Sequence, residues 1–502
     1  MLRDNLLQAV KHTSIYSISW IANGIAGVCL LPVYSRYLSR AEYGALDLVG
    51  QNNVIFKIVF AACFTYSLGR LYHDASNEEE KNKIISSGAT SAIAAGILAG
   101  ACLLLLNSQI SQLLLGDVKY SSLIIAGAFV LTMDIAFTGL TYEFLVTKKS
   151  TRYVAVNLAR LLTAITGNLV CLVWFELGAI SMLIGNSLGI LLANTCMAVP
   201  HFRKYGFLID VPTLKRMIAF GAPMIVAGIL ATLLHSSDRL MLRPFQDLEQ
   251  VGLFMMGLQF PNMLNAILVS SFGAIWSGSL MFTMAKQPDA DIQIGRFATY
   301  LLALFIAAQT ILGIFSASLL EILAAPKFAA SIPVAPIACL GFSFHAFYLF
   351  LVSKAFTHNN PKRMIICYAA PLLAKIASTI LLVPIYGFMG SACILTSGYL
   401  LFTVTCYLAF KKMNTTIFEW PRIISLFVLS ASFLLASYLT NQYDLVVQIL
   451  LQFLLAGLYI LCLALGPIFS KSEKLALLHE LINRFQQFRN QPAIKENTDA
   501  GN

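Results

Sequence analysis

The chain has 502 residues, of which 58% are hydrophobic and only 12% are charged, and its mean hydropathy is +0.76. Soluble domains carry about 25% charged residues, so this composition excludes an ordinary soluble protein and indicates an integral membrane protein. The net charge of +10 does not indicate a nucleic-acid partner, because the basic residues flank apolar segments and no extramembrane stretch is long enough for such a module.

Apolar segments long enough to cross a bilayer as a helix, about 20 residues each, recur fourteen times along the chain. They fall at 12–34, 44–69, 84–106, 120–146, 153–174, 177–200, 214–235, 250–280, 296–322, 333–356, 363–385, 388–410, 421–440 and 444–466. All connecting loops are short, so the sequence predicts an all-α, multi-pass membrane protein without a soluble catalytic domain. We therefore do not expect an enzyme. The ten cysteines stand singly in apolar runs, which predicts no metal site and no cofactor.

The distribution of Lys and Arg predicts the orientation of these spans. If the N-terminus is cytoplasmic, the cytoplasmic segments hold 25 of the 34 basic residues, the outer loops hold six, and three lie inside spans. Because positive residues accumulate on the cytoplasmic side of a membrane, we predict that both termini are cytoplasmic.

Two stretches of the chain are repeated at a nearly constant spacing. "RYLSRAEYGALDLVGQNN" after the first span is echoed by "RPFQDLEQVGLFMMGLQFPN" after the seventh, with Gly44 aligned to Gly252. "FELGAISMLIGNSLGILL" at the sixth span is echoed by "IYGFMGSACILTSGYLLF" at the twelfth, with Gly178 aligned to Gly387. The spacings are 208 and 209 residues (252 − 44 and 387 − 178), which predicts a parallel repeat of two six-helix lobes about an axis normal to the membrane.

This repeat sets the expected domain boundaries. We predict an N-terminal lobe at 1–204, a C-terminal lobe at 205–412, and two additional transmembrane helices at 413–470. The segment 471–502 places Leu, Ile and Phe on one helical face with basic residues around it, so it is predicted to form an amphipathic helix on the cytoplasmic membrane surface, followed by a disordered tail.

Three of these stretches also resemble a known family. "LLPVYSRYLSRAEYGALDL", "SSDRLMLRPFQDLEQVGLF" and "LVPIYGFMGSACILTSGYLL" are similar to the signatures of Wzx-type polysaccharide and O-antigen flippases, which belong to the multidrug/oligosaccharidyl-lipid/polysaccharide exporter superfamily. The resemblance covers roughly residues 5–412. The fourteen predicted spans exceed the twelve that are usual for O-antigen flippases and match the related lipid II flippases and some polysaccharide exporters.

The resemblance implies a fold, a cargo and a location. The two lobes would surround a central cavity that opens to one side at a time. The cargo would be an oligosaccharide on undecaprenyl pyrophosphate, moved from the inner to the outer leaflet of a bacterial cytoplasmic membrane for surface-polysaccharide synthesis. Membrane lipids, a coupling proton or sodium ion, and the polysaccharide polymerase are the further partners that it suggests. The alternative is a cation-coupled multidrug exporter of the same superfamily, for which an acidic cavity is expected.

Charged residues inside the spans mark candidate binding positions, because a charge at bilayer depth is costly and faces protein or water rather than lipid. Lys57, Arg160 and Lys375 are the basic ones, and Arg160 lies on a polar stripe that includes Asn157. Tyr368 lies on the corresponding stripe of Lys375. We predict that these five residues bind the cargo, because arginine fits two phosphate oxygens and lysine adds a point charge.

The acidic residues Asp47 and Asp134 are the candidates for coupling to an ion. The alternative is that the buried charges form structural ion pairs between neighbouring helices, such as Arg160 with Asp134. The excess of basic over acidic groups argues against complete internal pairing. His345 is predicted to be a hydrogen-bonded packing residue, with a titrating group as the alternative. Asp238, Arg239 and Arg243 are predicted to form an ion-pair network at the outer membrane interface.

Glycine and proline indicate where the lobes bend. The first span contains Gly24 and Gly27, and the seventh contains Gly221 and Pro223. A proline inside a helix removes one backbone hydrogen bond and bends the helix. We therefore predict that the first and seventh spans are the parts that bend, with these four residues as the hinges. The alternative is that the glycines serve only close helix packing.

Overall fold

The computed structural model describes residues 2–147, 149–276, 280–284, 289–352, 361–411 and 416–466, with helices and no strand among them. The amphipathic helix and tail predicted at 471–502 lie outside the described residues. Eleven of the described helices are long and apolar enough to cross a membrane, or twelve if a bent pair counts as one span. The all-helical, multi-pass architecture is therefore confirmed, whereas the number fourteen stays a prediction.

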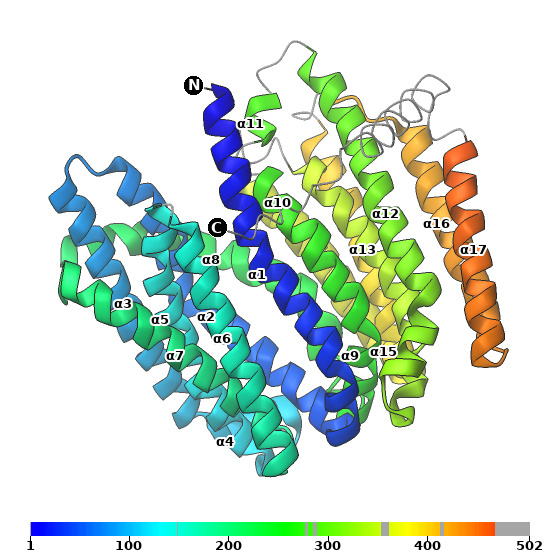
Figure 1. Cartoon of the computed structure of the whole chain (residues 1–502), viewed down its shortest axis with the longest axis horizontal. Coiled ribbons are helices and arrows are strands. Elements are labelled where there is room, and N and C mark those ends of the chain that lie inside the picture. The colour runs from blue at the N-terminus through cyan, green and yellow to red at the C-terminus, as the bar shows by residue number, and fades with distance from the viewer. Residues whose placement is uncertain are drawn as a thin grey trace, which may run out of the picture.

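Most helices of the first half of the chain form a group at one side of the molecule, while α1 (Leu2–Tyr37) runs through the middle of the view beside the second half (Figure 1). The other elements of the first half are α2 (Arg40–Asp74), α3 (Glu78–Leu105), α4 (Asn107–Leu115), η1 (Val118–Tyr120), α5 (Ser121–Val146), α6 (Ser150–Leu169), the π-helical η2 (Val170–Trp174) and α7 (Ile180–Tyr205).

The second half forms most of the other side, with the last two helices at its outer edge (Figure 1). Its elements are α8 (Val211–Leu240), α9 (Leu248–Asn265), the π-helical η3 (Ala266–Ser270), α10 (Ser271–Ile275), α11 (Met281–Met284), α12 (Ala290–Leu323), η5 (Pro326–Ser331), α13 (Val334–Leu351), α15 (Pro361–Phe410), α16 (Trp420–Thr440) and α17 (Leu445–Leu465).

The helix α15 covers two of the predicted spans, 363–385 and 388–410. Gly387 lies between them with φ 56° and ψ −138°, which is not helical geometry. Its counterpart in the sequence repeat, Gly178, also has a positive φ of 58° and lies between η2 and α7. Only glycine adopts this region without steric cost, so the aligned glycines mark the same break in both halves.

The repeat is also visible in the helix starts after the first loop of each half. Ser39 caps α2 by accepting a hydrogen bond from the Glu42 amide, and Asp247 caps α9 by accepting one from the Gln250 amide. Glu42 then accepts from the Ala179 amide beside Gly178. Asp247 and Gln250 follow Ser39 and Glu42 by the 208-residue spacing of the sequence repeat, so the repeated letters encode a repeated local structure.

The two aligned glycines Gly44 and Gly252 meet where α2 crosses α9, at what we call the glycine crossing. A β-carbon on Gly44 would overlap the carbonyl oxygen of Leu248, and one on Gly252 would overlap the carbonyl oxygen of Arg40. Leu248 is itself the counterpart of Arg40 in the repeat. The contact is therefore reciprocal, as expected where a two-fold relation between the halves passes through an interface.

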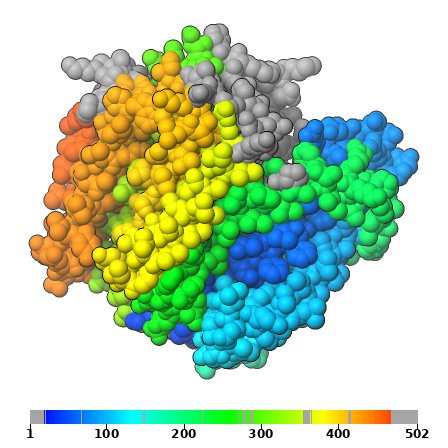
Figure 2. All heavy atoms as spheres, turned by 180° about the vertical axis from the view of Figure 1, so that it is seen from behind, coloured from blue at the N-terminus to red at the C-terminus, as the bar shows by residue number. Residues whose placement is uncertain are grey.

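The helix α8 follows the first half in the chain but packs along α2. Gly221 lies against the backbone of Cys63, and Gly228 lies near Ile58, so small residues allow the close approach. Figure 2 shows α8 in green beside the blue of α2. A bend of 45° separates Val211–Ala222 from Met224–Leu240. The second arm turns towards α15, which places α8 between the two halves.

Candidate functional site

Three charged side chains from three helices converge in the first half of the chain, and we call them the Asp134 cluster. The Lys57 ammonium of α2 lies 2.7 Å from Asp134 Oδ2 of α5, and an Arg160 guanidinium nitrogen of α6 lies 3.9 Å from Asp134 Oδ1. The guanidinium also lies over the Phe137 ring, 4.7 Å from its centroid, where a cation is attracted to the π face.

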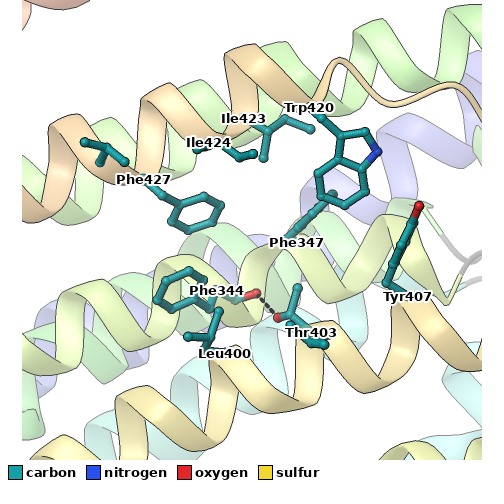
Figure 3. A pocket seen from close by; sticks show the side chains of 11 residues that line it. Phe344, Phe347, Leu400, Thr403, Tyr407, Trp420, Ile423, Ile424 and Phe427 are labelled. Atoms are coloured by element: carbon teal, nitrogen blue, oxygen red, sulfur yellow. Dashed lines mark hydrogen bonds between the residues drawn. The ribbon is translucent and has the colours of Figure 1, made fainter.

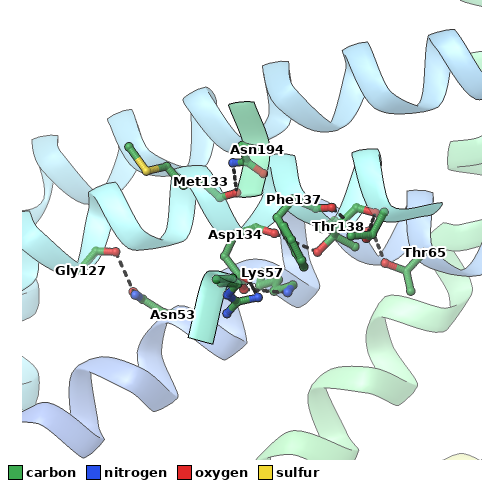
Figure 4. Close-up of polar contacts among 12 residues, drawn as sticks. Asn53, Lys57, Thr65, Gly127, Met133, Asp134, Phe137, Thr138 and Asn194 are labelled. Carbon is green, nitrogen blue, oxygen red and sulfur yellow. Dashed lines mark hydrogen bonds and ion pairs between the residues drawn. The ribbon is translucent and has the colours of Figure 1, made fainter. Parts of the chain in front are cut away.

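Hydrogen bonds between helices fix the position of Asp134 (Figure 4). The Asn53 amide donates to the Gly127 carbonyl and joins α2 to α5, while the Asn194 amide donates to the Met133 carbonyl and joins α7 to α5. These bonds support α5 at and before Asp134, so the carboxylate is held on a braced helix rather than on a loop.

The Asp134 cluster carries one net positive charge and is not sealed from its surroundings. Lys57 and Arg160 are each 33% exposed and Asp134 is 25% exposed. One carboxylate cannot neutralise two cations, so an additional anion is attracted to this position. An arginine beside a lysine offers both a planar fork and a point charge to phosphate oxygens.

Lys375 has a different environment from the other two basic residues. Its ammonium lies 2.7 Å from Asp238 Oδ1 of α8, with 2% of the lysine and 1% of the aspartate side chain exposed, and it donates to the Leu234 carbonyl at 2.7 Å. A β-carbon at Gly398 would collide with the Lys375 side chain, so this glycine makes room for the lysine. We call Lys375 and Asp238 the Lys375 pair.

The Lys375 pair corrects two expectations from the sequence. Lys375 has an acidic partner in Asp238. The predicted excess of basic over acidic groups inside the spans was therefore too large by one carboxylate. Asp238 is buried and forms its ion pair with Lys375 of α15 rather than with Arg239 or Arg243 beside it in the chain. Its neighbour Arg239 instead binds Asp47 of α2 at 3.2 Å, and Arg243 donates to the Leu115 carbonyl.

The remaining predicted residues are placed as follows. Asn157 donates its amide to the Tyr153 carbonyl of its own helix, and the Tyr368 hydroxyl lies 2.7 Å from that of Tyr348. The structure thus brings Lys57, Arg160 and Asp134 together, while Asp47, Lys375 and Tyr368 make other contacts. Roles of all these residues in cargo or ion binding stay predictions.

The predicted hinge residues lie at packed positions. A β-carbon on Gly24 would approach Met263 and Ile267, and one on Gly27 would approach Gln259, so α1 packs on α9 and η3 there. The 45° bend of α8 coincides with Pro223, of which only the backbone is described. Movement at these residues stays a prediction.

An apolar groove of about 590 Å³ lies between α13, the part of α15 that follows Gly387, and α16 (Figure 3). Phe344, Phe347, Tyr407, Trp420 and Phe427 contribute to its walls. The polar Thr403 hydroxyl is satisfied by the Phe344 carbonyl at 2.9 Å, so the lining presents hydrocarbon and aromatic surface. Such a surface suits an alkyl or prenyl chain.

A contact between the two histidines His235 and His345 was not expected from the sequence, in which His345 is predicted to be a packing residue. The His235 and His345 rings lie 4.8 Å apart, on α8 and α13. No spacing in the sequence signals this contact, because the residues are 110 positions apart (345 − 235). The signal available was only the polarity of each residue within an apolar span.

The fold and its buried charges define a multi-pass membrane protein with the helical arrangement of known transporters. Two solved structures illustrate the similarity. "Lipid II flippase MurJ, inward closed conformation" is 14% identical with a TM-score of 0.72, covering 88% of this chain and 97% of that one. A mutant of the Vibrio cholerae MATE transporter VcmN is 13% identical with a TM-score of 0.60, covering 81% of this chain and 96% of that one. At these identities the comparison establishes the fold.

The family follows from the sequence itself. The family described as "Polysaccharide biosynthesis protein" matches residues 9–276, which is more than half of the chain. The chain therefore belongs to this polysaccharide biosynthesis family, and the resemblance seen in the sequence is confirmed. No curated protein matches the sequence.

Proposed function

We propose that this protein is a flippase that moves undecaprenyl-pyrophosphate-linked oligosaccharide from the inner to the outer leaflet of a bacterial cytoplasmic membrane, with both termini cytoplasmic. The observation that carries the proposal is the Asp134 cluster, in which two partly exposed cations share one carboxylate at membrane depth. A pyrophosphate supplies the negative charge that this cluster lacks.

In this proposal Asp134 holds the site in the absence of cargo. Arg160 and Lys57 bind the diphosphate, and Asp134 competes for both cations when the cargo leaves. Release then does not leave two unpaired cations at membrane depth, which is the costly arrangement. Lys375 is sealed in its own pair and is not part of this contact set. The apolar groove beside α16 supports the proposal because it suits the prenyl chain of such a cargo.

The alternative is a MATE-like exporter of organic cations, which the similarity in fold to MATE transporters keeps open. The net positive charge of the Asp134 cluster disfavours a cationic ligand by direct repulsion. Transport of a fluorescent organic cation by the purified protein in vesicles, with no movement of lipid-linked sugar, would favour this alternative.

The test of the flippase proposal is movement of labelled lipid-linked oligosaccharide across vesicles that contain the purified protein. Arg160→Ala should abolish transport with protein levels near normal, and Arg160→Lys should restore it only partly because lysine loses the two-pronged contact. Arg70→Ala is the matched control, since Arg70 is exposed and pairs with Asp74. Full transport by Arg160→Ala would contradict the proposed site.

A further inference from the structure

The loop that joins the two halves of the chain displays a row of large apolar side chains. It runs from Gly206 to Val211, between the end of α7 and the first residue of α8, and we call it the linker segment. Within it Phe207, Leu208, Ile209 and Val211 are 75%, 39%, 48% and 54% exposed. A contiguous exposed apolar cluster of this kind indicates an interaction surface.

Hydrogen bonds hold the linker segment against α3. The buried Ser86 hydroxyl donates to the Gly206 carbonyl at 2.7 Å, and the Asp210 amide donates to the buried Ser87 hydroxyl at 3.1 Å. Gly206 has a positive φ of 71°, which glycine adopts without steric cost. Asp210 then caps α8 by accepting from the Thr213 amide. Both ends of the loop are tied down, so a fixed backbone presents the apolar side chains outward.

Basic residues flank the linker segment on both sides. Arg203 and Lys204 lie in the last turn of α7, and Lys215 and Arg216 follow the start of α8. These four cations and the single carboxylate between them give a net charge of +3 (4 − 1). Arg216 pairs with a glutamate of α3. Arg203 and Lys215, in contrast, are exposed and form no ion pair within the part of the chain that the structure describes.

The acidic start of α3 does not neutralise this charge. Its three glutamates are already paired, as Glu78–Lys81, Glu79–Lys83 and Glu80–Arg216. The Asp210 carboxylate is used to cap α8. The surface therefore combines exposed hydrocarbon with cations that lack an anionic partner.

The position of the linker segment indicates which partner fits it. It joins α7 directly to α8, and both helices are long and apolar enough to cross a membrane, α8 as a bent pair. A loop this short between two spans lies at the level of the lipid headgroups. Apolar side chains beside basic ones suit that level, because hydrocarbon enters the acyl boundary while the cations attract anionic headgroups.

We propose that the linker segment, with Arg203 and Lys215, is a binding site for anionic phospholipid of the leaflet at this end of the helices. The apolar side chains enter the bilayer surface, and the two cations bind the phosphate of a headgroup with net negative charge. Because this loop is the covalent link between the halves, the bound lipid holds their junction at the membrane surface. The site is separate from the Asp134 cluster and does not depend on the proposed flippase function.

The first experiment measures the depth of the loop in a bilayer. A spin label is placed on Ile209→Cys of the full chain after the exposed Cys29, Cys196 and Cys393 are replaced by serine. In nanodiscs that contain phosphatidylglycerol, the label should be more accessible to oxygen, which partitions into lipid, than to a water-soluble nickel chelate. A label on Ser76→Cys, in the polar loop between α2 and α3, is the control and should show the reverse.

Two outcomes of this measurement overturn the proposal. A label at position 209 that is as accessible to the chelate as the control label shows that the loop lies in water. A label that is shielded from both reagents shows that a protein surface covers the loop instead of lipid.

The second experiment tests the charge of the ligand. Native mass spectrometry of the purified chain, titrated with phosphatidylglycerol or phosphatidylcholine, should show preferential binding of phosphatidylglycerol. The double variant Arg203→Gln with Lys215→Gln should weaken that binding by about fivefold for each charge removed. The matched control is Arg70→Gln with Lys83→Gln, which removes two exposed cations that pair with neighbouring carboxylates and should keep the wild-type preference.

The two double variants separate a site from a general effect of net charge. Equal losses in both would show that the attraction depends on the total charge and not on the linker segment, which overturns the proposal. Equal binding of the two lipids by the wild type overturns it as well. Neither measurement requires transport, so the result stands whether or not lipid-linked sugar is moved.

Discussion

The two halves of the molecule share the same helix starts and backbone contacts, but the charged side chains inside their spans differ in pairing and in burial. In the first half, Lys57 and Arg160 share Asp134 and remain one-third exposed. In the second half, Lys375 and Asp238 form a one-to-one pair that is almost fully sealed. The repeat therefore preserves the helix starts and the glycine crossing, while the charges have diverged into one open group and one closed pair.

The difference shows which charges are available for binding. A sealed pair has already exchanged water for its partner, so neither member can accept a ligand without leaving the other unpaired. An open group with an excess cation can exchange its carboxylate for another anion. Burial and pairing, rather than the presence of a charge in a span, distinguish a structural lysine from a candidate binding lysine.

The largest expected effect comes from breaking the sealed pair. Lys375→Ala leaves Asp238 buried and unpaired, and we expect it to reduce stability by about 3–5 kcal/mol. Thermal unfolding of the purified protein in detergent would measure the change. The double variant Lys375→Met with Asp238→Leu removes both charges and should recover most of the loss. A single variant as stable as wild type would show that the pair is open to water.

An intermediate effect is expected at the contact that the halves share. Gly44→Ala and Gly252→Ala each place a methyl group against a backbone carbonyl, and such overpacking costs about 1–3 kcal/mol. Because the contact is reciprocal, the two losses should be similar, and the double variant should be non-additive. Gly50→Ala is the control, since nothing lies within 4 Å of its β-carbon position. Equal stability of all three variants would contradict a tight crossing.

The smallest effect is expected in the open group. Lys57→Met removes one cation, but Arg160 still accompanies Asp134, and partly exposed pairs contribute about 0–1 kcal/mol. The same thermal measurement should therefore place Lys57→Met close to wild type, although transport of lipid-linked sugar should fall. A loss as large as that of Lys375→Ala would mean that the two charge groups are equivalent, and that the comparison drawn above is wrong.

The sequence by itself determined the features that depend on local composition. Long apolar runs without charge predict membrane-crossing helices, because each segment must satisfy its own backbone hydrogen bonds in lipid. The aligned glycines at 44 and 252 and at 178 and 387 also reflect local needs, since a positive φ or a backbone contact at one position requires glycine there. An ion pair between Arg160 and Asp134 was one of the two alternatives that the sequence left open. It could be predicted because the two spans are neighbours in the chain.

Only the tertiary structure decided which charges pair and which helices meet. Lys375 and Asp238 are 137 residues apart (375 − 238), and nothing near either residue specifies the other. The placement of α8 along α2 brings Arg239 to Asp47, and a separate contact of α8 with α13 brings His235 beside His345. Hydropathy and helix periodicity describe each segment on its own, whereas ion pairing at membrane depth depends on how several helices pack together. The roles of buried charges are therefore decided by long-range packing rather than by local sequence.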